Sequence, residues 1–397
     1  MVKLFEIIEK PITGEWGKND DVGNGIPVLR TTNFTNEGHI NYSKVVTRKI
    51  NSSKIKNKLL RTSDIIIEKS GGGPDQPVGR VVYFEGEPNK YLSNNFTSIL
   101  RITDKATCNA KYLFYQLWWY HKTGKTNSYQ NKTTGISNLK LDKYVRELDI
   151  RLPSILSQNM IVKTLDSVIE LLALRKQQLA ELDNLTKSIF YDMFGDPVIN
   201  EKGWETGKIK DLALKIQYGT SAKASSERLS RFSVPILRMN NITYQGSIDL
   251  TDLKYVDLDE KQKEKYLVYK GDMLFNRTNS KELVGKTAVF REEKPMAYAG
   301  YLVRLVPNEK ANSEFISAYL NSIYGKKLLM KMAKNIVGMA NINAQEMSNI
   351  DIYIPPIELQ NKFADTVMQI EKHKTLINKA ITETQYLFDS LMSEYFD

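Results

Sequence analysis

The sequence has few of the residues that build metal and redox sites. Its 397 residues include one cysteine, Cys108, and three histidines at positions 39, 121 and 373. A single cysteine excludes an internal disulfide, and neither residue type has the spacing of a zinc site. The sequence has no run of 18 apolar residues and opens without an apolar signal segment. We therefore expect neither secretion nor a membrane span, and a cytoplasmic location.

Positive charge is abundant by comparison. The chain carries 56 Lys and Arg against 46 Asp and Glu, a formal net charge of +10 at pH 7. The excess lies within residues 1–153 and 201–356, whereas the stretches 154–194 and 357–396 are slightly acidic. Because Lys and Arg neutralise phosphates and release counterions, a polyanion such as nucleic acid is the natural partner. The alternative is a basic surface that serves only solubility.

Two parts of the sequence repeat each other. Residues 26–33 (IPVLRTTN) return as 234–241 (VPILRMNN), at an offset of 208. A second match, at an offset of 202, relates 155–194 to 357–396. A period near 200 is too long for a solenoid. We therefore predict two copies of one large unit, joined end to end.

Each copy ends in a stretch that predicts one long helix. Neither stretch is interrupted by Pro or Gly, and apolar residues recur at alternating spacings of four and three. This is the heptad pattern of a coiled coil. The predicted seam residues are Leu165, Val168, Leu172, Leu179, Leu182, Val367, Ile370, Ile377, Ile381 and Phe388. About 160 residues lie between the helices, and a compact unit of that size need not carry the chain back along the first helix, so we predict an antiparallel pair.

Short apolar runs bounded by polar residues predict buried strands in both globular parts, for example at 64–67 and 272–275. The predicted fold class is therefore α+β, with two duplicated mixed α/β domains joined by a long antiparallel two-helix coiled coil. The predicted segments are 1–153 for the first domain, 154–194 for the first helix, 195–356 for the second domain and 357–397 for the second helix.

The loops that follow the duplicated strands, 68–77 and 276–283, differ in sequence between the copies. Arg matches the edge of guanine, and Asn or Gln that of adenine, whereas Lys, Ser and Thr more often hold phosphate. By residue type and place, the candidate DNA-binding residues are Arg30, Lys69, Gln76, Arg80, Tyr218, Thr220, Lys223, Arg238, Asn241, Arg277, Asn279 and Lys281. For each of them, the alternative is a surface ion pair or a turn.

Two other functions compete with DNA recognition. Asp272, Glu292 and Lys294 have the spacing of a metal-dependent nuclease, in which two carboxylates hold the ion and Lys polarises the phosphate. The first copy keeps Asp64 but has no matching Lys, which favours a structural role for the aspartate. The remaining alternative is a coiled-coil adaptor without any nucleic-acid role.

The order of basic domain, heptad helix, basic domain and heptad helix resembles the specificity subunit of type I restriction-modification systems, often called HsdS. The motifs that carry the resemblance are 218–223 (YGTSAK), 234–241 (VPILRMNN), 271–275 (GDMLF) and the helix entry 354–360 (IPPIELQ). Each motif alone is weak, but together, in duplicate and in order, they are strong, and the resemblance covers the whole chain.

This resemblance implies two target recognition domains, each reading half of a split site in double-stranded DNA. It implies a non-catalytic chain with no cofactor or metal of its own, bound to two modification subunits that methylate adenine with S-adenosylmethionine. Restriction subunits that use ATP and magnesium can join them. The first copy departs from the pattern because it lacks the YGTSAK loop and has GEWG at 14–17. Contacts therefore cannot be transferred from one copy to the other by sequence.

Overall fold

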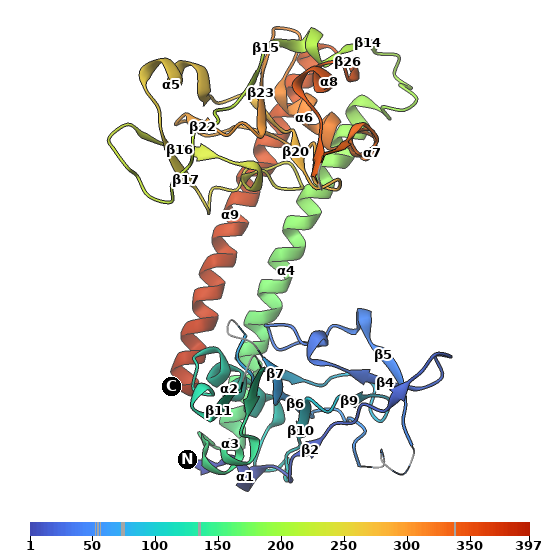
Figure 1. Ribbon diagram of the computed structural model, residues 1–397, viewed down its shortest axis with the longest axis vertical. Coiled ribbons are helices and arrows are strands. Elements are labelled where there is room, and N and C mark those ends of the chain that lie inside the picture. Colours follow the sequence, from blue (N-terminus) through green and yellow to red (C-terminus); the bar gives the residue numbers. More distant parts are fainter. Residues whose placement is uncertain (52, 54, 56, 73–75, 134–135, 337–338) are drawn as a thin grey trace. The chain divides into compact units, whose positions relative to one another are not determined.

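The structure is a computed structural model that describes residues 1–51, 53, 55, 57–72, 76–133, 136–336 and 339–397. The chain divides into two compact units (Figure 1). Unit 1 comprises Met1–Leu174 and Ile381–Asp397, and unit 2 comprises Arg175–Ala380. Both units mix helices with strands, so the predicted α+β class with a duplicated unit is confirmed.

A central four-stranded antiparallel sheet forms the core of each unit. In unit 1 its order is β2 (Ile12–Thr13), β10 (Thr97–Leu100), β6 (Ile65–Glu68) and β8 (Val81–Tyr83). In unit 2 the order is β15 (Ala213–Tyr218), β23 (Leu302–Pro307), β19 (Met273–Asn276) and β21 (Thr287–Val289). The two orders match strand for strand. All four residues of β6 and all four of β19 are buried, as expected for short apolar runs at a sheet centre.

A second four-stranded sheet differs between the units at its edges. Its order in unit 1 is β3 (Lys18–Asn19), β5 (Val46–Lys49), β4 (Ile26–Leu29) and β9 (Leu92–Ser93). In unit 2 it is β17 (Lys254–Asp257), β16 (Ser233–Leu237), β22 (Met296–Tyr298) and β18 (Leu267–Val268). The parallel pair β4–β9 matches β16–β22, so the duplicated segment forms the same strand in both units. In unit 2, helix α5 (Glu260–Tyr266) lies between β17 and β18 in the chain.

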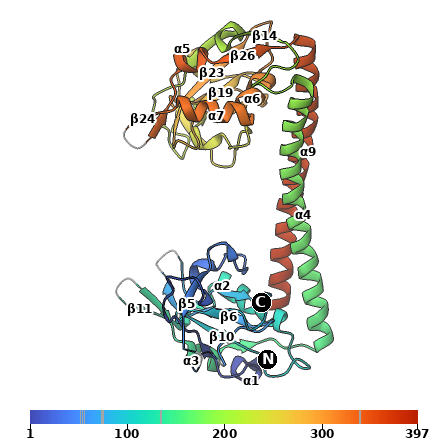
Figure 2. The same ribbon diagram turned by 90° about the vertical axis from the view of Figure 1, so that its right-hand side faces the viewer.

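Two small sheets complete each unit. A three-stranded sheet contains a hairpin whose first strand is labelled in Figure 2. Its strands are β11 (Gln130–Thr133), β12 (Ile136–Leu139) and β7 (Ser70–Gly72) in unit 1, and β24 (Lys334–Ile336), β25 (Met339–Asn341) and β20 (Thr278–Asn279) in unit 2. A two-stranded sheet pairs β1 (Val2–Lys3) with β13 (Asp149–Ile150), and β14 (Glu205–Lys208) with β26 (Asp351–Ile354). This pairing joins the start of each globular part to the residues that precede its long helix.

Short helices pack against these sheets. In unit 1 they are α1 (Leu4–Ile7), α2 (Ala110–Lys122) and α3 (Leu141–Glu147). In unit 2, besides α5, they are α6 (Ser313–Asn321), α7 (Ile323–Met332) and α8 (Ala344–Ser348). The aromatic side chains of α2 are mostly buried, so they belong to the core and do not form a base-stacking surface.

The two long helices are α4 (Ile155–Phe194) and α9 (Ile357–Phe396), with 40 residues each. At 1.5 Å per residue, each is roughly 60 Å long. In unit 1 the first half of α4 shares a core with the end of α9, where Leu165 and Phe388 belong to one buried cluster. In unit 2 the end of α4 meets the start of α9, and the rings of Phe190 and Phe363 lie 6.0 Å apart. The helices therefore run antiparallel within each unit.

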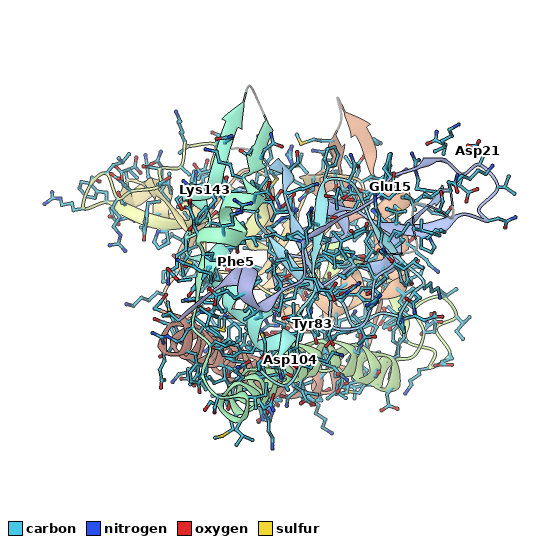
Figure 3. All side chains as sticks on the ribbon, turned by 90° about the horizontal axis from the view of Figure 1, so that it is seen from below. Phe5, Glu15, Asp21, Tyr83, Asp104 and Lys143 are labelled. Atoms are coloured by element: carbon cyan, nitrogen blue, oxygen red, sulfur yellow. The ribbon has the colours of Figure 1, made fainter. Side chains whose placement is uncertain are left out.

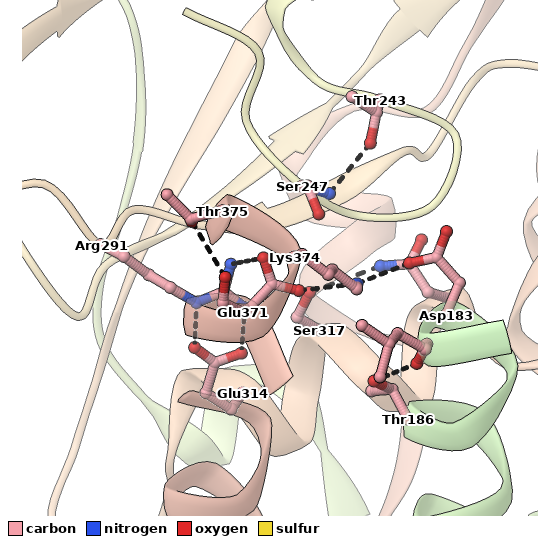
Figure 4. Close-up of polar contacts among 12 residues, drawn as sticks. Asp183, Thr186, Thr243, Ser247, Arg291, Glu314, Ser317, Glu371, Lys374 and Thr375 are labelled. Carbon is pink, nitrogen blue, oxygen red and sulfur yellow. Dashed lines mark hydrogen bonds and ion pairs between the residues drawn. The ribbon is translucent and has the colours of Figure 1, made fainter. Parts of the chain in front are cut away.

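Every predicted seam residue is at least partly covered. Leu165, Val168, Leu172, Val367, Ile370 and Phe388 are buried, and Leu179, Leu182, Ile377 and Ile381 are partly buried. A polar seam position is paired in unit 2: Lys374 Nζ lies 2.5 Å from Asp183 Oδ1 on α4 and 2.8 Å from Glu371 Oε1 on its own helix (Figure 4). The lysine charge is thus neutralised where it interrupts the apolar seam.

An arginine extends this network to the sheet side of unit 2. Arg291 donates to both carboxylate oxygens of Glu314, each at 2.7 Å, and its guanidinium lies 3.7 Å from Glu371 (Figure 4). A bidentate pair of this kind has a defined geometry as well as a favourable charge interaction. Through Glu314 and Glu371, Arg291 connects α6 to α9 beside a cavity of about 60 Å³.

A buried glutamine ties each globular part to its long helix. Gln158 Nε2 donates to the carbonyls of Pro153 (2.8 Å) and Thr107 (3.0 Å), and its Oε1 accepts from Asn109 N–H (2.8 Å). In unit 2, Gln360 makes the same set of bonds with Pro355, Lys310 and Asn312. A neutral amide with two donors and an acceptor satisfies all three backbone groups at once. This explains why a glutamine recurs at the offset of 202.

Within the described ranges, no helix combines the length and apolar character that a membrane span requires.

We expect Gln158→Ala to loosen the segment around Cys108, which lies between Thr107 and Asn109. Cys108 is 1% exposed, and burial raises the pKa of its thiol to about 12. At pH 8 the native thiol therefore reacts only through local opening. Loss of the amide leaves a buried N–H unpaired, at a cost of about 1–3 kcal/mol. Labelling by a thiol reagent should accelerate roughly 5- to 100-fold, as measured by mass spectrometry over time.

Two controls separate this clamp from general instability. Gln178→Ala changes an exposed glutamine on the same helix, and Gln360→Ala removes the equivalent clamp from unit 2. Both variants should label Cys108 at the wild-type rate. Equal acceleration in all three variants would show that the thiol reports global unfolding and not the Gln158 contact.

Candidate nucleic-acid interface

Lys69 and Arg277 occupy the same backbone position, where the central strand passes into the small three-stranded sheet. Lys69 N–H donates to Phe96 O at 2.9 Å, and Lys69 O accepts from Leu139 N–H at 2.8 Å. The matching bonds of Arg277 join it to Tyr301 (3.0 Å) and Ile342 (2.9 Å). Backbone bonds on both sides therefore place a cationic residue at this point in each unit, although the side chains differ.

A closely packed glycine lies next to the residue that contacts each cation. A Cβ built on Gly14 would lie 2.2 Å from Asn94 O, and one on Gly219 would lie 2.2 Å from Tyr298 O. Such distances leave no room for a side chain, so the backbone itself packs here. The next residue is held in the same way in both units: Glu15 N–H donates to Ser93 O at 2.8 Å, and Thr220 N–H donates to Tyr298 O at 2.9 Å.

The residue before each glycine contacts the cation. Lys69 Nζ donates to Thr13 Oγ1 at 3.1 Å. In unit 2 the Arg277 guanidinium lies 5.0 Å from the centroid of the Tyr218 ring, and Tyr218 Oη accepts from Ala344 N–H at 2.9 Å. Positions 13 and 218 are therefore equivalent, as are 69 and 277. The partner of the cation is a hydroxyl in one unit and an aromatic ring in the other.

An exposed aromatic side chain completes each cluster. Phe96 is 48% exposed and Tyr301 is 51% exposed. They are equivalent residues, because each carbonyl accepts the N–H of the cationic residue described above. The residues that follow them, Thr97 and Leu302, are fully buried.

A hydroxyl–amide pair links the next strand to the hairpin in both units. Ser70 Oγ donates to Asn138 Oδ1 at 2.6 Å, and Asn341 Nδ2 donates to Thr278 Oγ1 at 2.8 Å. These contacts account for the asparagine that recurs just after each hairpin turn. They anchor the hairpin to the strand that begins directly after Lys69 or Arg277.

The two clusters are electropositive at their centre. In the part of the chain that the structure describes, neither Lys69 nor Arg277 forms an ion pair with a carboxylate. Burial and the neighbouring Lys58 ammonium lower the pKa of Lys69. An anion such as phosphate would favour the charged form of this lysine. Glu15, which Figure 3 labels, forms an ion pair with Lys58 at 2.9 Å.

Four other predicted contact residues are engaged inside the fold. Arg80 donates to both oxygens of Glu68, at 2.7 and 3.2 Å, and to Thr31 O at 3.2 Å. Arg238 binds the carbonyl and the carboxylate of Asp252, at 2.8 and 2.7 Å. These pairs neutralise both guanidinium groups, so their geometry indicates structural roles.

The remaining two of the four are Arg30 and Asn241. Arg30 Nη2 donates to Lys44 O at 3.0 Å, as its counterpart Arg238 does to Asp252 O. Asn241 is 2% exposed; its Oδ1 accepts from Arg238 N–H and its Nδ2 donates to Asp249 O. The amide of Asn241 is thus fully used as a cap, and it has no free edge for adenine.

The other candidates lie nearer the surface. Gln76, Lys223 and Lys281 are exposed, and Asn279 is partly buried on β20, where its side chain accepts from Ser280 N–H. Thr220 is buried, and its hydroxyl accepts from Ala222 N–H at 3.1 Å. Residues 73–75, in the loop expected to vary between the copies, lie outside the described residues. Among these candidates, the structure thus brings Tyr218 and Arg277 into contact, and Thr220 and Asn279 each follow two residues later in the chain.

The sequence analysis missed four residues of these clusters: Thr13, Glu15, Phe96 and Tyr301. The signal that relates them is an offset of 205, which joins Thr13-Gly14-Glu15 to Tyr218-Gly219-Thr220 and Phe96 to Tyr301. The GEWG segment is therefore the counterpart of the YGTSAK loop. Because Gly is the only residue shared by these two segments, sequence comparison at the offset of 208 does not find them.

The geometry does not favour the nuclease alternative. Asp272 is 4% exposed, and its Oδ2 accepts from Arg304 Nε and from Tyr269 N–H, both at 2.7 Å. Asp64 binds Arg101 in the same way in unit 1, which indicates a repeated structural ion pair. Glu292 and Lys294 are exposed. Among the described residues, no group of three or more His, Cys, Asp or Glu side chains has the arrangement of a metal site.

Comparisons with known proteins identify the family. The type I restriction modification DNA specificity domain matches residues 1–184 and again residues 201–384. The EcoKI specificity subunit of Escherichia coli (strain K12) is 22% identical over 397 residues, covering 94% of this chain and 82% of that protein. A putative MjaX specificity subunit of Methanocaldococcus jannaschii is 30% identical over 197 residues, or 49% of this chain and 45% of that protein. This chain thus spans less than half of the second relative.

Two solved structures share the fold. The S subunit of a type I restriction-modification system from M. genitalium has 15% identity and a TM-score of 0.57, with 100% of this chain and 95% of that chain covered. A chain from a study of complex assembly in a type I restriction-modification system has 16% identity and a TM-score of 0.58, with 100% and 96% covered. Since the family match covers most of the sequence in two copies, the chain belongs to the type I restriction-modification DNA specificity family.

Proposed function

We propose that this chain is the DNA sequence-recognition subunit of a type I restriction-modification complex, and that it reads a bipartite duplex site, one half with each unit. The observation that carries this proposal is the pair of equivalent clusters around Lys69 and Arg277. A shared backbone frame with an unpaired cation favours the same class of ligand in both units. Different side chains on that frame favour different base sequences, because base edges are read by individual side-chain groups.

In this proposal the chain carries no catalytic chemistry. Two adenine methyltransferase subunits supply methylation with S-adenosylmethionine, and restriction subunits with ATP and magnesium can join them. The commitment of Asp64 to Arg101 and of Asp272 to Arg304 supports this division, because the repeated carboxylates are neutralised inside the fold. A cytoplasmic location, with access to chromosomal DNA, is part of the same proposal.

Mapping of methylated adenines in cells tests the two-part site. Cells that contain this chain and its methyltransferase partner should methylate a sequence made of two short specified parts separated by unspecified bases. Cells with the partner alone should lose that pattern, because the partner has no means of sequence recognition without this chain. Methylation of one continuous sequence would contradict reading by two separate units.

Assays on the purified chain test the absence of catalysis. The chain alone should bind a duplex that carries the mapped site, with an affinity that falls steeply as salt rises, because phosphate contacts release counterions. It should transfer no methyl group and cleave no DNA in magnesium. Cleavage that disappears in Glu292→Ala would instead support the nuclease alternative, and DNA binding that is absent at low salt would support the adaptor.

A further inference from the structure

We infer that each unit has one base-reading site built on four equivalent positions, in which an exposed ring contacts the bases beside a cation. The inference rests on the proposed function and specifies where reading occurs. The four positions are Thr13, Glu15, Lys69 and Phe96 in unit 1, and Tyr218, Thr220, Arg277 and Tyr301 in unit 2.

The exposure of the two aromatic rings supports contact with bases. Phe96 and Tyr301 are about half exposed, although each directly precedes a strand whose first residue is fully buried. The fold therefore leaves a large aromatic surface in water at the same point in both units, next to a residue whose cation pairs with no carboxylate in the described part of the chain. In a duplex the grooves present base edges and the thymine methyl group, and an aromatic ring packs favourably on that methyl group. Contact with bases accounts for an exposed ring that the core of the unit does not use.

A difference in charge pairing among the basic residues supports the same sites. Arg80 and Arg238 are neutralised by Glu68 and Asp252. Lys69 and Arg277 have no such carboxylate within the described residues, although Lys69 is partly buried. A partly buried cation without an acid is poorly compensated in the free protein. An approaching phosphate or guanine edge would supply the missing acceptor.

The geometry of Arg277 assigns it to base reading. Its guanidinium lies over the Tyr218 ring, and its Nε contacts Thr278 Oγ1 at 3.4 Å. A ring and a hydroxyl thus restrict the plane of the guanidinium, and a fixed plane suits the bidentate match to guanine. Lys69 has a single contact, with Thr13 Oγ1. A compact ammonium with one neutral partner is better suited to phosphate.

The residues that flank the glycines supply the difference between the sites. Their backbones are fixed by the contacts at Gly14 and Gly219, so a change of side chain leaves the frame intact. Unit 1 has an exposed Thr13 and the carboxylate of Glu15, which binds Lys58, whereas unit 2 has an exposed Tyr218 and the buried hydroxyl of Thr220. A carboxylate only accepts hydrogen bonds, and a hydroxyl both donates and accepts. The two sites therefore favour different bases.

Tyr301→Ala should weaken binding of the full chain to a duplex with the mapped site about 10- to 100-fold. The dependence of log affinity on log salt should not change, because no charge is removed. Binding to a random duplex of equal length should also stay the same. Phe96→Ala should do the same through the other half of the site, and Tyr301→Phe should retain most of the affinity because the ring remains.

Tyr244→Ala is the matched control. Tyr244 is 47% exposed in unit 2, and Lys326 Nζ lies 3.3 Å from its ring centroid, but it lies outside the four positions. This variant should bind as the wild type does. Wild-type affinity in Tyr301→Ala, or equal loss of affinity for specific and random duplexes, would overturn the inference.

Arg277→Lys tests the assignment to a base. The charge is kept, so the salt dependence should remain, but the bidentate match is lost. In methylation mapping, one guanine position in one half of the site should become relaxed, with a loss of discrimination of about 5- to 100-fold. The other half should be read as before, which also shows that the variant is folded. Full retention of the methylated sequence would overturn the role of Arg277.

Methylation mapping distinguishes failure of the reading sites from failure of the proposed function. If the wild type methylates a split site, and Tyr301→Ala and Arg277→Lys keep the wild-type affinity and methylated sequence, the reading sites are overturned and the proposed function stands. Absence of split-site methylation in the wild type itself would overturn both.

Discussion

The close backbone approach at Gly14 and Gly219 is the constraint on which both candidate interfaces depend. A Cβ at either glycine would lie 2.2 Å from a carbonyl oxygen, so the contact is made by main chain alone. The backbone at these points is therefore fixed without help from neighbouring side chains. The residues that flank each glycine are positioned by main-chain hydrogen bonds, and their side chains do not take part in the close contact. Thr13 and Tyr218 can therefore occupy one position despite their different size and chemistry.

Charge pairing divides the arginines and lysines into two groups that look alike in sequence. Arg80 and its counterpart Lys286 both donate to the carbonyl of a helical turn, at Thr31 and Met239. Arg80 is neutralised by Glu68, whereas burial lowers the pKa of Lys286. The ion pair stabilises the charge of Arg80, whereas burial disfavours the charged form of Lys286; both side chains nevertheless hold the turn through its carbonyl. Within the described residues, Lys69 and Arg277 pair with neither a carboxylate nor a backbone carbonyl, so their charges remain available to a ligand.

The sequence predicts what depends on periodicity. The heptad pattern placed the long helices close to Ile155–Phe194 and Ile357–Phe396, because one apolar seam must persist over 40 residues. It could not reveal that Arg80 and Asn241 are engaged internally, since Glu68 and Asp249 meet them only through the fold. Nor could the sequence pattern relate Phe96 to Tyr301. The exposure of their rings and the equivalence of their backbone hydrogen bonds appear only in the folded structure, and differences in loop length shift the offset from 208 to 205.

The repeated glutamines and the repeated reading positions have different physical origins. Gln158 and Gln360 are fixed because their amides must satisfy three backbone groups, and any other side chain leaves a buried group unpaired. At Thr13 and Tyr218 the side-chain bonds are exposed to water instead: Thr13 Oγ1 accepts from Lys69 Nζ, and Tyr218 Oη accepts from Ala344 N–H. A substitution at Thr13 or Tyr218 therefore costs little folding energy, while one at Gln360 costs much. Substitutions where the globular part joins its helix therefore destabilise the fold, whereas substitutions at the reading positions do so much less. The recognised DNA sequence can thus change without loss of the fold.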